Sequence, residues 1–315
     1  MYYNEFLDEI EKQVKNRLPK EMEVICHQIM KNNGILLDAI SIRKREEPVS
    51  PTIYLNVFYE EYKEGKTIDE IVDEIMELYV NHHPEFEWDL DQFLDFEQVR
   101  KKIVFKVINK QKNYQLLKEI PHKDILDLSI VYYCLVESSE YENASILIQN
   151  RHCEIWDITG EELYQIAIKN SALLLPYCLD SMEKIMKEIF YNNVETCWKS
   201  GDKENVNTIL NDWIAETEKE ENRIPMYILT NQVKMYGAAC MFYPQVLERF
   251  AEKLKQDLYI LPSSIHEVIL LPANEIGNPE ELKEMVREVN QHEVAGDEIL
   301  SDHVYYYSRK QKKLM

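Results

Sequence analysis

The sequence predicts an α+β protein in which antiparallel β-hairpins and sheets are covered by amphipathic helices, in two regions. In several segments apolar residues recur at every third or fourth position, which indicates helices with one buried face. Short β-rich runs come in pairs joined by turn residues, which indicates hairpins. The chain has 315 residues, of which 45% are hydrophobic, so it can bury a core and form two domains.

The N-terminal segment is predicted to be a helix followed by a hairpin. A helix is expected over residues 3–18 and ends at Pro19. Its apolar stripe repeats every fourth position: Phe6, Ile10, Val14 and Leu18. The hairpin turns at Asn33-Gly34, because this dipeptide readily adopts the positive φ angles of a tight turn.

Two helices are expected after the hairpin. The first is indicated by aromatic residues at helical spacing, which we expect to pack on the hairpin: Tyr54, Phe58, Tyr59 and Tyr62. The second begins with the capping box of Thr67 and Glu70. Both helices would complete a first sub-block, residues 1–85.

Residues 99–190 are predicted to form a second sub-block. The run at 101–109 fits a strand or a helix, and two long strands are expected at 125–136 and 144–156. Thr159 and Glu162 form another capping box for a following helix.

The prediction divides the chain into an N-terminal region, residues 1–190, and a C-terminal domain, residues 224–315. Between them, residues 191–223 are rich in charge and poor in apolar periodicity, as expected of a linker or an exposed insertion. The C-terminal domain is predicted to be ββαββα-like, with a final edge strand: 226–231, 237–243, 244–256, 257–262, 266–272, 279–290 and 303–307.

Charge limits the partners and the compartment that we expect. The chain has 36 Lys and Arg against 57 Asp and Glu, a net charge of −21, which disfavours nucleic acid and anionic membranes. The acidic start lacks the basic and apolar pattern of a secretory signal, and no stretch has the roughly 18 apolar residues of a membrane helix. These observations predict a cytoplasmic location.

No cofactor or metal is expected from the motifs. The six cysteines form no CxxC pair, and the chain contains neither GxGxxG nor GxxxxGK[ST]. His82 and His83 lack a third ligand at a telling offset. The acidic run at 89–97 lacks the glycine and the bidentate glutamate of a calcium loop.

The stretch DLYILPSSIHEVILLPA, residues 257–273, holds the candidate site residues. Ser264 and His266 lie two residues apart, so on an extended strand they would stand about 6.5–7 Å apart, beyond the roughly 3 Å of a nucleophile and its base. Glu267 would face the opposite side. This spacing favours a turn over a hydrolase site. The polar tip of this turn is the candidate binding surface: Ser263, Ser264, His266 and Glu267.

The tripeptide SDH, residues 301–303, contains the three letters of a catalytic triad in a row. Contiguous residues cannot adopt triad geometry, which gathers distant chain segments. We therefore expect Ser301 or Asp302 to cap or turn the chain into its last strand.

Several phrases together resemble an uncharacterised bacterial family with a domain of unknown function, found mainly in anaerobic Firmicutes of the gut. They are NNGILLDAISIR, PTIYLNVFYEEYKEG, YGAACMFYP, DLYILPSSIHEVILLP and LSDHVYYYSR. The resemblance covers nearly the whole chain. It implies a bacterial cytoplasmic protein, sometimes encoded near mobile elements, and carries no activity, cofactor or catalytic residue.

The leading functional prediction is a non-catalytic protein-interaction or regulatory module, because no catalytic set is complete. One alternative is a small-molecule hydrolase or transferase that uses Ser264 and His266. Another is an acidic regulator or nucleic-acid mimic that binds a basic partner. A protein partner is expected, and exposed edges of antiparallel sheets leave room for self-association.

Overall fold

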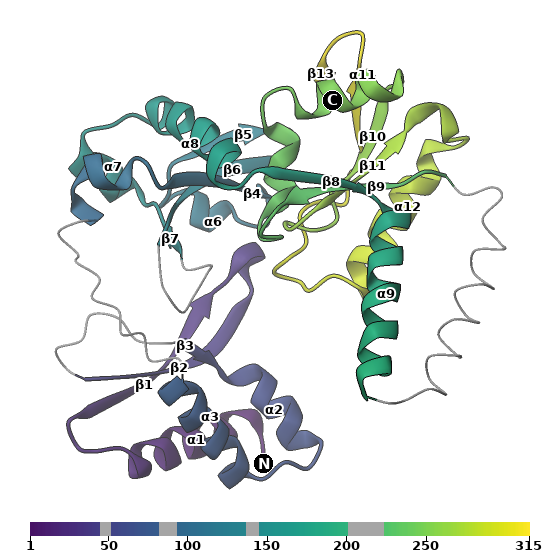
Figure 1. The fold of residues 1–315 in the computed structure, drawn as a ribbon. Helices are drawn as coiled ribbons and strands as arrows, with labels where there is room; N and C mark the ends of the chain where they lie inside the picture. The colour runs from purple at the N-terminus through teal and green to yellow at the C-terminus, as the bar shows by residue number, and fades with distance from the viewer. Residues whose placement is uncertain (45–51, 82–92, 137–144, 201–223) are drawn as a thin grey trace. The chain divides into compact units, whose positions relative to one another are not determined.

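The computed structural model describes residues 1–44, 52–81, 93–136, 145–200 and 224–315. Contacts divide the chain into an N-terminal unit, residues 1–90 with 137–144, and a C-terminal unit, residues 91–136 with 145–315. The three sheets found in these ranges are antiparallel and helices pack on them, so the predicted α+β class is confirmed (Figure 1). Within the described residues, no helix combines the length and the apolar character needed to cross a membrane.

The N-terminal unit is a three-stranded sheet with helices on one face. Its elements are α1 (Tyr3–Arg17), β1 (Met22–Met30), β2 (Leu36–Lys44), β3 (Thr52–Tyr54), α2 (Leu55–Lys63) and α3 (Ile68–Asn81). Asn33 and Gly34 have φ angles of 62° and 70°, so the predicted hairpin turn is confirmed. The predicted capping box is present as well, since the Thr67 hydroxyl and the Glu70 carboxylate bond to one another's backbone N–H.

The core of the N-terminal unit comes from the periodicity of its elements. The apolar stripe of α1 packs against the inner face of the hairpin and against α3. Residues at the centre of this core are fully buried: Phe6, Ile10, Ile40, Leu55, Ile71 and Ile75. Each such side chain contributes about 1.5–3 kcal/mol through burial.

The C-terminal unit begins with a four-stranded sheet. Its strands are β4 (Ile103–Asn109), β5 (His122–Ile125), β6 (Leu128–Leu135) and β7 (Ser145–Leu147), and its helices are α5 (Phe96–Val99), α6 (Tyr114–Leu117), α7 (Asn150–Trp156) and α8 (Gly160–Leu174). Ser171 of α8 accepts the N–H of Phe105 on one face, whereas Leu117 of α6 packs with Ile108 on the other. Figure 1 shows α8 and α6 on opposite sides of this sheet.

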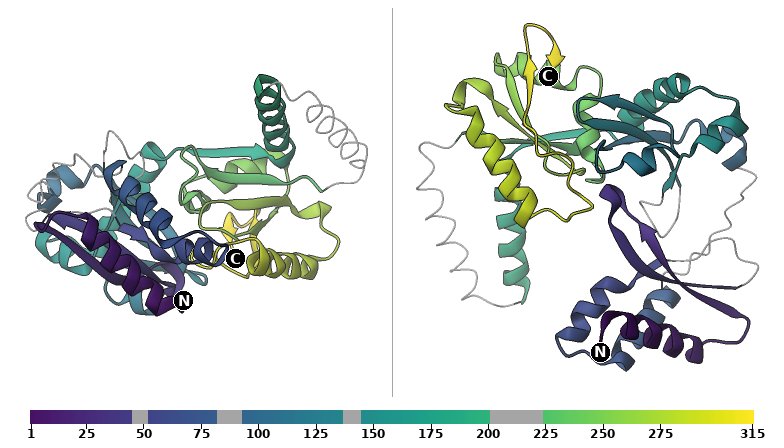
Figure 2. Two further views of the ribbon diagram at one scale, coloured as in Figure 1. Left: turned by 90° about the horizontal axis from the view of Figure 1, so that it is seen from below. Right: turned by 180° about the vertical axis from the view of Figure 1, so that it is seen from behind.

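A six-stranded sheet forms the rest of the C-terminal unit, in the order β13-β12-β10-β11-β9-β8. Its elements are β8 (Tyr177–Ser181), α9 (Met182–Ser200), β9 (Tyr227–Asn231), η3 (Gly237–Phe242), α11 (Val246–Leu254), β10 (Leu258–Leu261), β11 (Val268–Pro272), η4 (Ala273–Glu275), α12 (Pro279–His292), β12 (Tyr305–Ser308) and β13 (Lys313–Leu314). α12 packs on one face through Leu282 and Val286. On the other face, Phe250 of α11 meets the ring of Tyr227 at 4.9 Å. Figure 2 shows the ribbon of α12, in yellow-green, beside this sheet.

One predicted strand is wrong, and the strand predicted at 144–156 is confirmed only at its start, where β7 covers Ser145–Leu147. Within the strand predicted at 237–243, Gly237–Phe242 form the 3-10 helix η3. Gly237 lies too close to the neighbouring backbone for a side chain, since a Cβ there would come within 2.5 Å of the His266 carbonyl oxygen. Residues 150–156 form the helix α7, in which His152 and Trp156, four residues apart, are both buried.

The units of the structure differ from the predicted regions. The division falls near residue 90, close to the predicted end of the first sub-block, rather than near 190. The reason is β8, a strand that the sequence did not indicate: it pairs with β9 along five residues, and so joins the predicted N-terminal region to the six-stranded sheet. Most of the predicted linker, residues 201–223, lies outside the described residues.

Candidate functional site

Two Ser-x-His tripeptides in the C-terminal unit fold into the same local turn. They are Ser264-Ile265-His266 and Ser301-Asp302-His303. In each, the serine hydroxyl accepts the backbone N–H of the histidine, at 3.0 Å in the first and 2.9 Å in the second. Serine hydroxyls close turns in this way when a backbone amide needs an acceptor. We refer to them as the first and the second Ser-x-His turn.

The segments that carry the two turns lie side by side. Three backbone hydrogen bonds of 2.9–3.0 Å join them: Ile265 N–H to Glu298 O, Leu300 N–H to Ser263 O, and Ser301 N–H to Pro262 O. This pairing places the Glu298 side chain next to His266. The sequence distance between the turns is therefore no guide to their distance in the fold.

In the first turn, the structure does not place the Ser264 hydroxyl against the imidazole of His266. The hydroxyl instead accepts the backbone N–H of that histidine, and Ser264 is only 8% exposed. Ser264 is therefore held as a turn residue, the role that strand spacing favours. A hydrolytic role for the pair would require the Ser264 O–H to donate to a nitrogen of the His266 ring.

The His266 ring is fixed by the segment that leads into η3. Its Nδ1 accepts the backbone N–H of Tyr236 at 3.3 Å, and the two rings stack with centroids 5.7 Å apart. Because Nδ1 is an acceptor, we assign the proton of the neutral ring to Nε2. Nε2 lies 3.5 Å from Oε1 of Glu298. The imidazole is thus aimed at a carboxylate that the prediction did not include.

Glu267, the last residue of the predicted surface, is partly buried. Burial raises the pKa of its carboxyl group, the nearby His266 lowers it, and Glu298 raises it further, so that the net shift is upward. Ser263, at the start of the tip, contributes its carbonyl oxygen to the bond from Leu300. The predicted surface therefore contains one turn serine, one oriented imidazole and one carboxyl group in an unfavourable setting.

In the second turn, one carboxylate gathers three side chains. Asp127, in the connection between β5 and β6, accepts the Ser301 hydroxyl at Oδ2 over 2.7 Å and the Tyr305 hydroxyl at Oδ1 over 2.6 Å. Nδ1 of His303 lies 3.1 Å from the same Oδ2. The predicted turn role of Ser301 is confirmed, and the acid that completes the cluster is 174 residues away in sequence.

The pKa of Asp127 reflects two opposing effects. Burial raises it, but the bonds from Ser301, Tyr305 and His303 together outweigh burial and leave the pKa below its ordinary value. For Tyr305, burial and the bond to Asp127 both raise the pKa. The carboxylate is therefore charged and the phenol neutral over the ordinary pH range.

Geometry indicates a structural role for the second turn. In a hydrolase triad the imidazole stands between the serine and the acid. Here Ser301 and His303 both bind Oδ2 of Asp127, and Ser301 is 1% exposed, so its hydroxyl is closed to a substrate. Asn109 adds a further bond from β4, donating to the carbonyl oxygen of Leu300 at 3.0 Å. These polar contacts join the four-stranded sheet to the segment that enters β12.

Metal ligands and acidic side chains are the remaining candidates for a site. Over the residues that the structure describes, no three His, Cys, Asp or Glu side chains are grouped so as to hold a metal ion. His82, His83 and the first part of the 89–97 run lie outside these residues. In the N-terminal unit an open groove of about 450 Å³ is lined by Glu70, Asp73, Glu74, Glu77, Leu78 and Asn81. Ion pairs with Arg17 and Lys66 offset part of its charge.

Comparison with known proteins gives a family for the chain. Residues 3–309 match the profile described as a family of unknown function, DUF5688. The chain belongs to this family. The DUF5688 match spans both Ser-x-His turns, and the expected membership in a family without assigned function is confirmed. No curated protein and no solved structure matches this DUF5688 chain.

Sequence reasoning missed the partners of both histidines. Tyr236, Glu298 and Asp127 carry no motif, and each reaches its histidine through tertiary structure. One signal was available in the sequence: Ser-x-His occurs twice in the last 60 residues or so, each time before a β-rich run. That repetition indicates a shared turn, although it does not indicate the acids.

Proposed function

We propose that this DUF5688 protein is a non-catalytic protein-interaction or regulatory module that binds through the surface of the first Ser-x-His turn. The observation that supports the proposal is that Ser264 Oγ and His266 Nδ1 both accept backbone N–H groups. The two groups a hydrolase would use are therefore engaged in holding a turn.

The surface of this turn has the composition of a recognition site. Tyr236 and His266 present stacked, partly exposed rings, and the Glu298 side chain beside them is 46% exposed. Aromatic side chains that combine an apolar face with a polar group are enriched in protein interfaces, because they bury area while losing little conformational entropy. The rigid backbone of the turn would preorganise these groups for a partner.

A second candidate is an acidic regulator that binds a basic partner. The excess of 57 acidic over 36 basic residues supports it, since opposite charge speeds and strengthens association. Such binding should weaken markedly as ionic strength rises from about 50 to 300 mM, because the Debye length falls below 10 Å. Binding through the first turn should show a weaker dependence.

Affinity capture with a matched pair of variants tests the proposal. His266→Asn removes the ring while its amide oxygen can still accept the Tyr236 N–H. His122→Asn, on β5 in the same unit, makes the same chemical change at another partly exposed histidine. We expect the wild-type chain and His122→Asn to capture the same partner protein in equal amounts. The amount captured by His266→Asn should be at least about fivefold lower. Equal capture by all three chains would contradict binding through the first turn.

A serine-directed label separates binding from hydrolysis. A fluorophosphonate phosphonylates serines that a neighbouring base activates, forming an O–P bond as fluoride leaves. We expect no labelling of Ser264 in the full chain. Labelling of Ser264 that His266→Asn abolishes would overturn the non-catalytic proposal in favour of the hydrolase alternative.

A further inference from the structure

Lys106 places a charge among apolar side chains of the four-stranded sheet, on a face that also carries Ser129, His122 and Asp124. It lies at the middle of β4, and strand register puts Val104, Ile108, Val131 and Tyr133 on the same face. Two hydrophobic clusters flank it, one around Ile108 and one around Val104. Lysine is seldom found in such a setting without a partner, because removing an ammonium group from water is unfavourable.

The partners of the Lys106 ammonium are aromatic. Its Nζ lies 4.0 Å from the ring centre of Tyr236 and 5.9 Å from that of Tyr133, whose rings meet edge to face. Among the described residues, no carboxylate lies within 4.0 Å of this nitrogen. In a chain with such an excess of acid, the missing counter-charge is unexpected for a partly buried lysine. The face of a tyrosine ring attracts a cation but does not neutralise it.

Two other features with a free-energy cost lie at the same place. Tyr236 has a left-handed backbone, with φ at 56°, a conformation that side chains with a Cβ rarely adopt outside functional or tightly constrained positions. The hydroxyl of Tyr133, which is 2% exposed, is buried without a hydrogen-bond partner. Each such feature in a native fold calls for an explanation.

We infer that Lys106, Tyr236 and His266 form a binding site for a small oxyanion, a carboxylate or a phosphate. The ammonium supplies the charge and up to three hydrogen-bond donors, and the Tyr236 ring holds it in place. His266 supplies a second donor at Nε2, since its Nδ1 is engaged by the Tyr236 N–H. Glu298 lies 3.5 Å from Nε2 and is well exposed, so it can turn toward solvent when an anion binds.

This inference goes beyond the proposed function, because a small oxyanion needs no protein partner. The ordinary explanation of Lys106 is that its methylene chain covers apolar surface while the ammonium reaches water. The two explanations differ in what they expect of an added anion. Only the oxyanion site expects saturable binding that depends on this one lysine.

The test is titration of the full chain with inorganic phosphate and, separately, with succinate, at ionic strength held constant with sodium chloride. We expect saturable heat and a raised melting temperature for at least one anion, with a Kd of roughly 1 mM or below. Saturable binding of phosphate alone, or of succinate alone, would identify the kind of oxyanion, and either result supports the site. Absence of saturation by both would overturn it.

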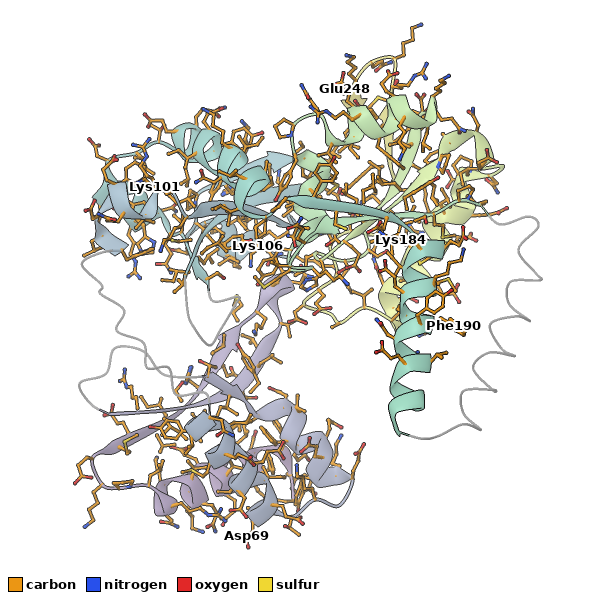
Figure 3. The ribbon with its side chains drawn as sticks, viewed as in Figure 1. Asp69, Lys101, Lys106, Lys184, Phe190 and Glu248 are labelled. Atoms are coloured by element: carbon orange, nitrogen blue, oxygen red, sulfur yellow. The ribbon has the colours of Figure 1, made fainter. Side chains whose placement is uncertain are left out.

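Lys106→Met and Lys101→Met form the matched pair, and both lysines are labelled in Figure 3. Lys101 is exposed and lies just before β4, so its loss removes the same charge from the same unit. We expect Lys106→Met to weaken anion binding about tenfold or more, and Lys101→Met to change it less than about twofold. Equal weakening by both would show general attraction and overturn the site.

Chemical protection in the wild-type chain avoids any question of folding in the variants. Acetic anhydride acylates accessible lysine amines, and mass spectrometry measures the extent at each position. We expect the saturating anion to slow modification of Lys106 while leaving Lys101 unchanged. Unchanged modification of Lys106 would overturn the inference, whereas capture of a partner protein is measured independently of it.

Discussion

The two Ser-x-His turns share a local structure, with a carboxylate beside each histidine ring, but they are held in the fold by different contacts. Both close with a serine hydroxyl that accepts the histidine N–H. The first is then held through its own backbone: the Thr230 hydroxyl donates to the His266 carbonyl oxygen at 2.8 Å, and Gly237 packs directly against that oxygen. The second is held by a charge, the carboxylate of Asp127.

This difference shows which residues decide the surroundings of each histidine. A serine two residues before a histidine is sufficient to form the turn, since both groups are local. Whether the histidine ring stacks on a tyrosine or binds a partly buried carboxylate depends on residues from the segment before η3 and from the β5–β6 connection. Each turn should therefore fail through a different substitution.

The largest expected effect is on the first turn. Gly237→Ala would place a Cβ against the Thr230 hydroxyl, 2.5 Å from the His266 carbonyl oxygen and 2.7 Å from the Asn231 nitrogen. Because two of these neighbours are backbone, we expect a loss of about 3 kcal/mol or more, measured by chemical denaturation. Gly160→Ala is the control, since nothing lies within 4 Å of its Cβ. Similar stability of the two variants would show that the close packing at the first turn is unimportant.

The next effect concerns the charge in the second turn. Asp127→Asn removes the carboxylate that binds Ser301, Tyr305 and His303, and we expect a loss of about 2–4 kcal/mol at pH 7. Folding lowers the pKa of Asp127, so the carboxylate stabilises the folded state fully above its unfolded pKa of about 3.9. This stabilisation is lost as the pH falls through the folded pKa. The wild-type advantage over Asp127→Asn should therefore shrink below about pH 4. An advantage independent of pH would contradict a role for the charge.

The two serines allow a direct comparison of the turns. Ser301→Ala breaks the turn bond and removes one of the two hydroxyl donors to Asp127, leaving that of Tyr305, whereas Ser264→Ala breaks the turn bond alone. We expect losses of about 2 kcal/mol and about 1 kcal/mol, respectively, in the free energy of unfolding. Equal losses would mean that the turn bond, and not the carboxylate, sets the stability of the second turn.

The smallest effect has the opposite sign. Burial raises the pKa of Glu267 when the chain folds. Its ionisation therefore lowers the stability of the folded state as the pH rises from the unfolded pKa to the folded pKa, and the loss remains at higher pH. Glu267→Gln should therefore raise the melting temperature slightly at pH 7 and have less effect near pH 4. A decrease at pH 7 would show that the charge is compensated at the first turn.

Much of the fold could be predicted from local patterns. The Asn33-Gly34 hairpin, the capping box at Thr67 and the helix of the Phe6 stripe all depend on residues within a few positions of one another. The strand predicted at 237–243 failed because η3 is set by how closely Gly237 approaches another segment, and β8 was missed because its pairing with β9 is long-range.

For the candidate site, the sequence by itself determined the turns and their serines, since a hydroxyl and an amide two residues apart meet whatever surrounds them. Only the tertiary structure decided that His266 stacks on Tyr236 near Glu298, and that Asp127 binds Ser301 and His303. These contacts join elements far apart in the chain. Their formation depends on the packing of whole sheets, which no local pattern of residues encodes.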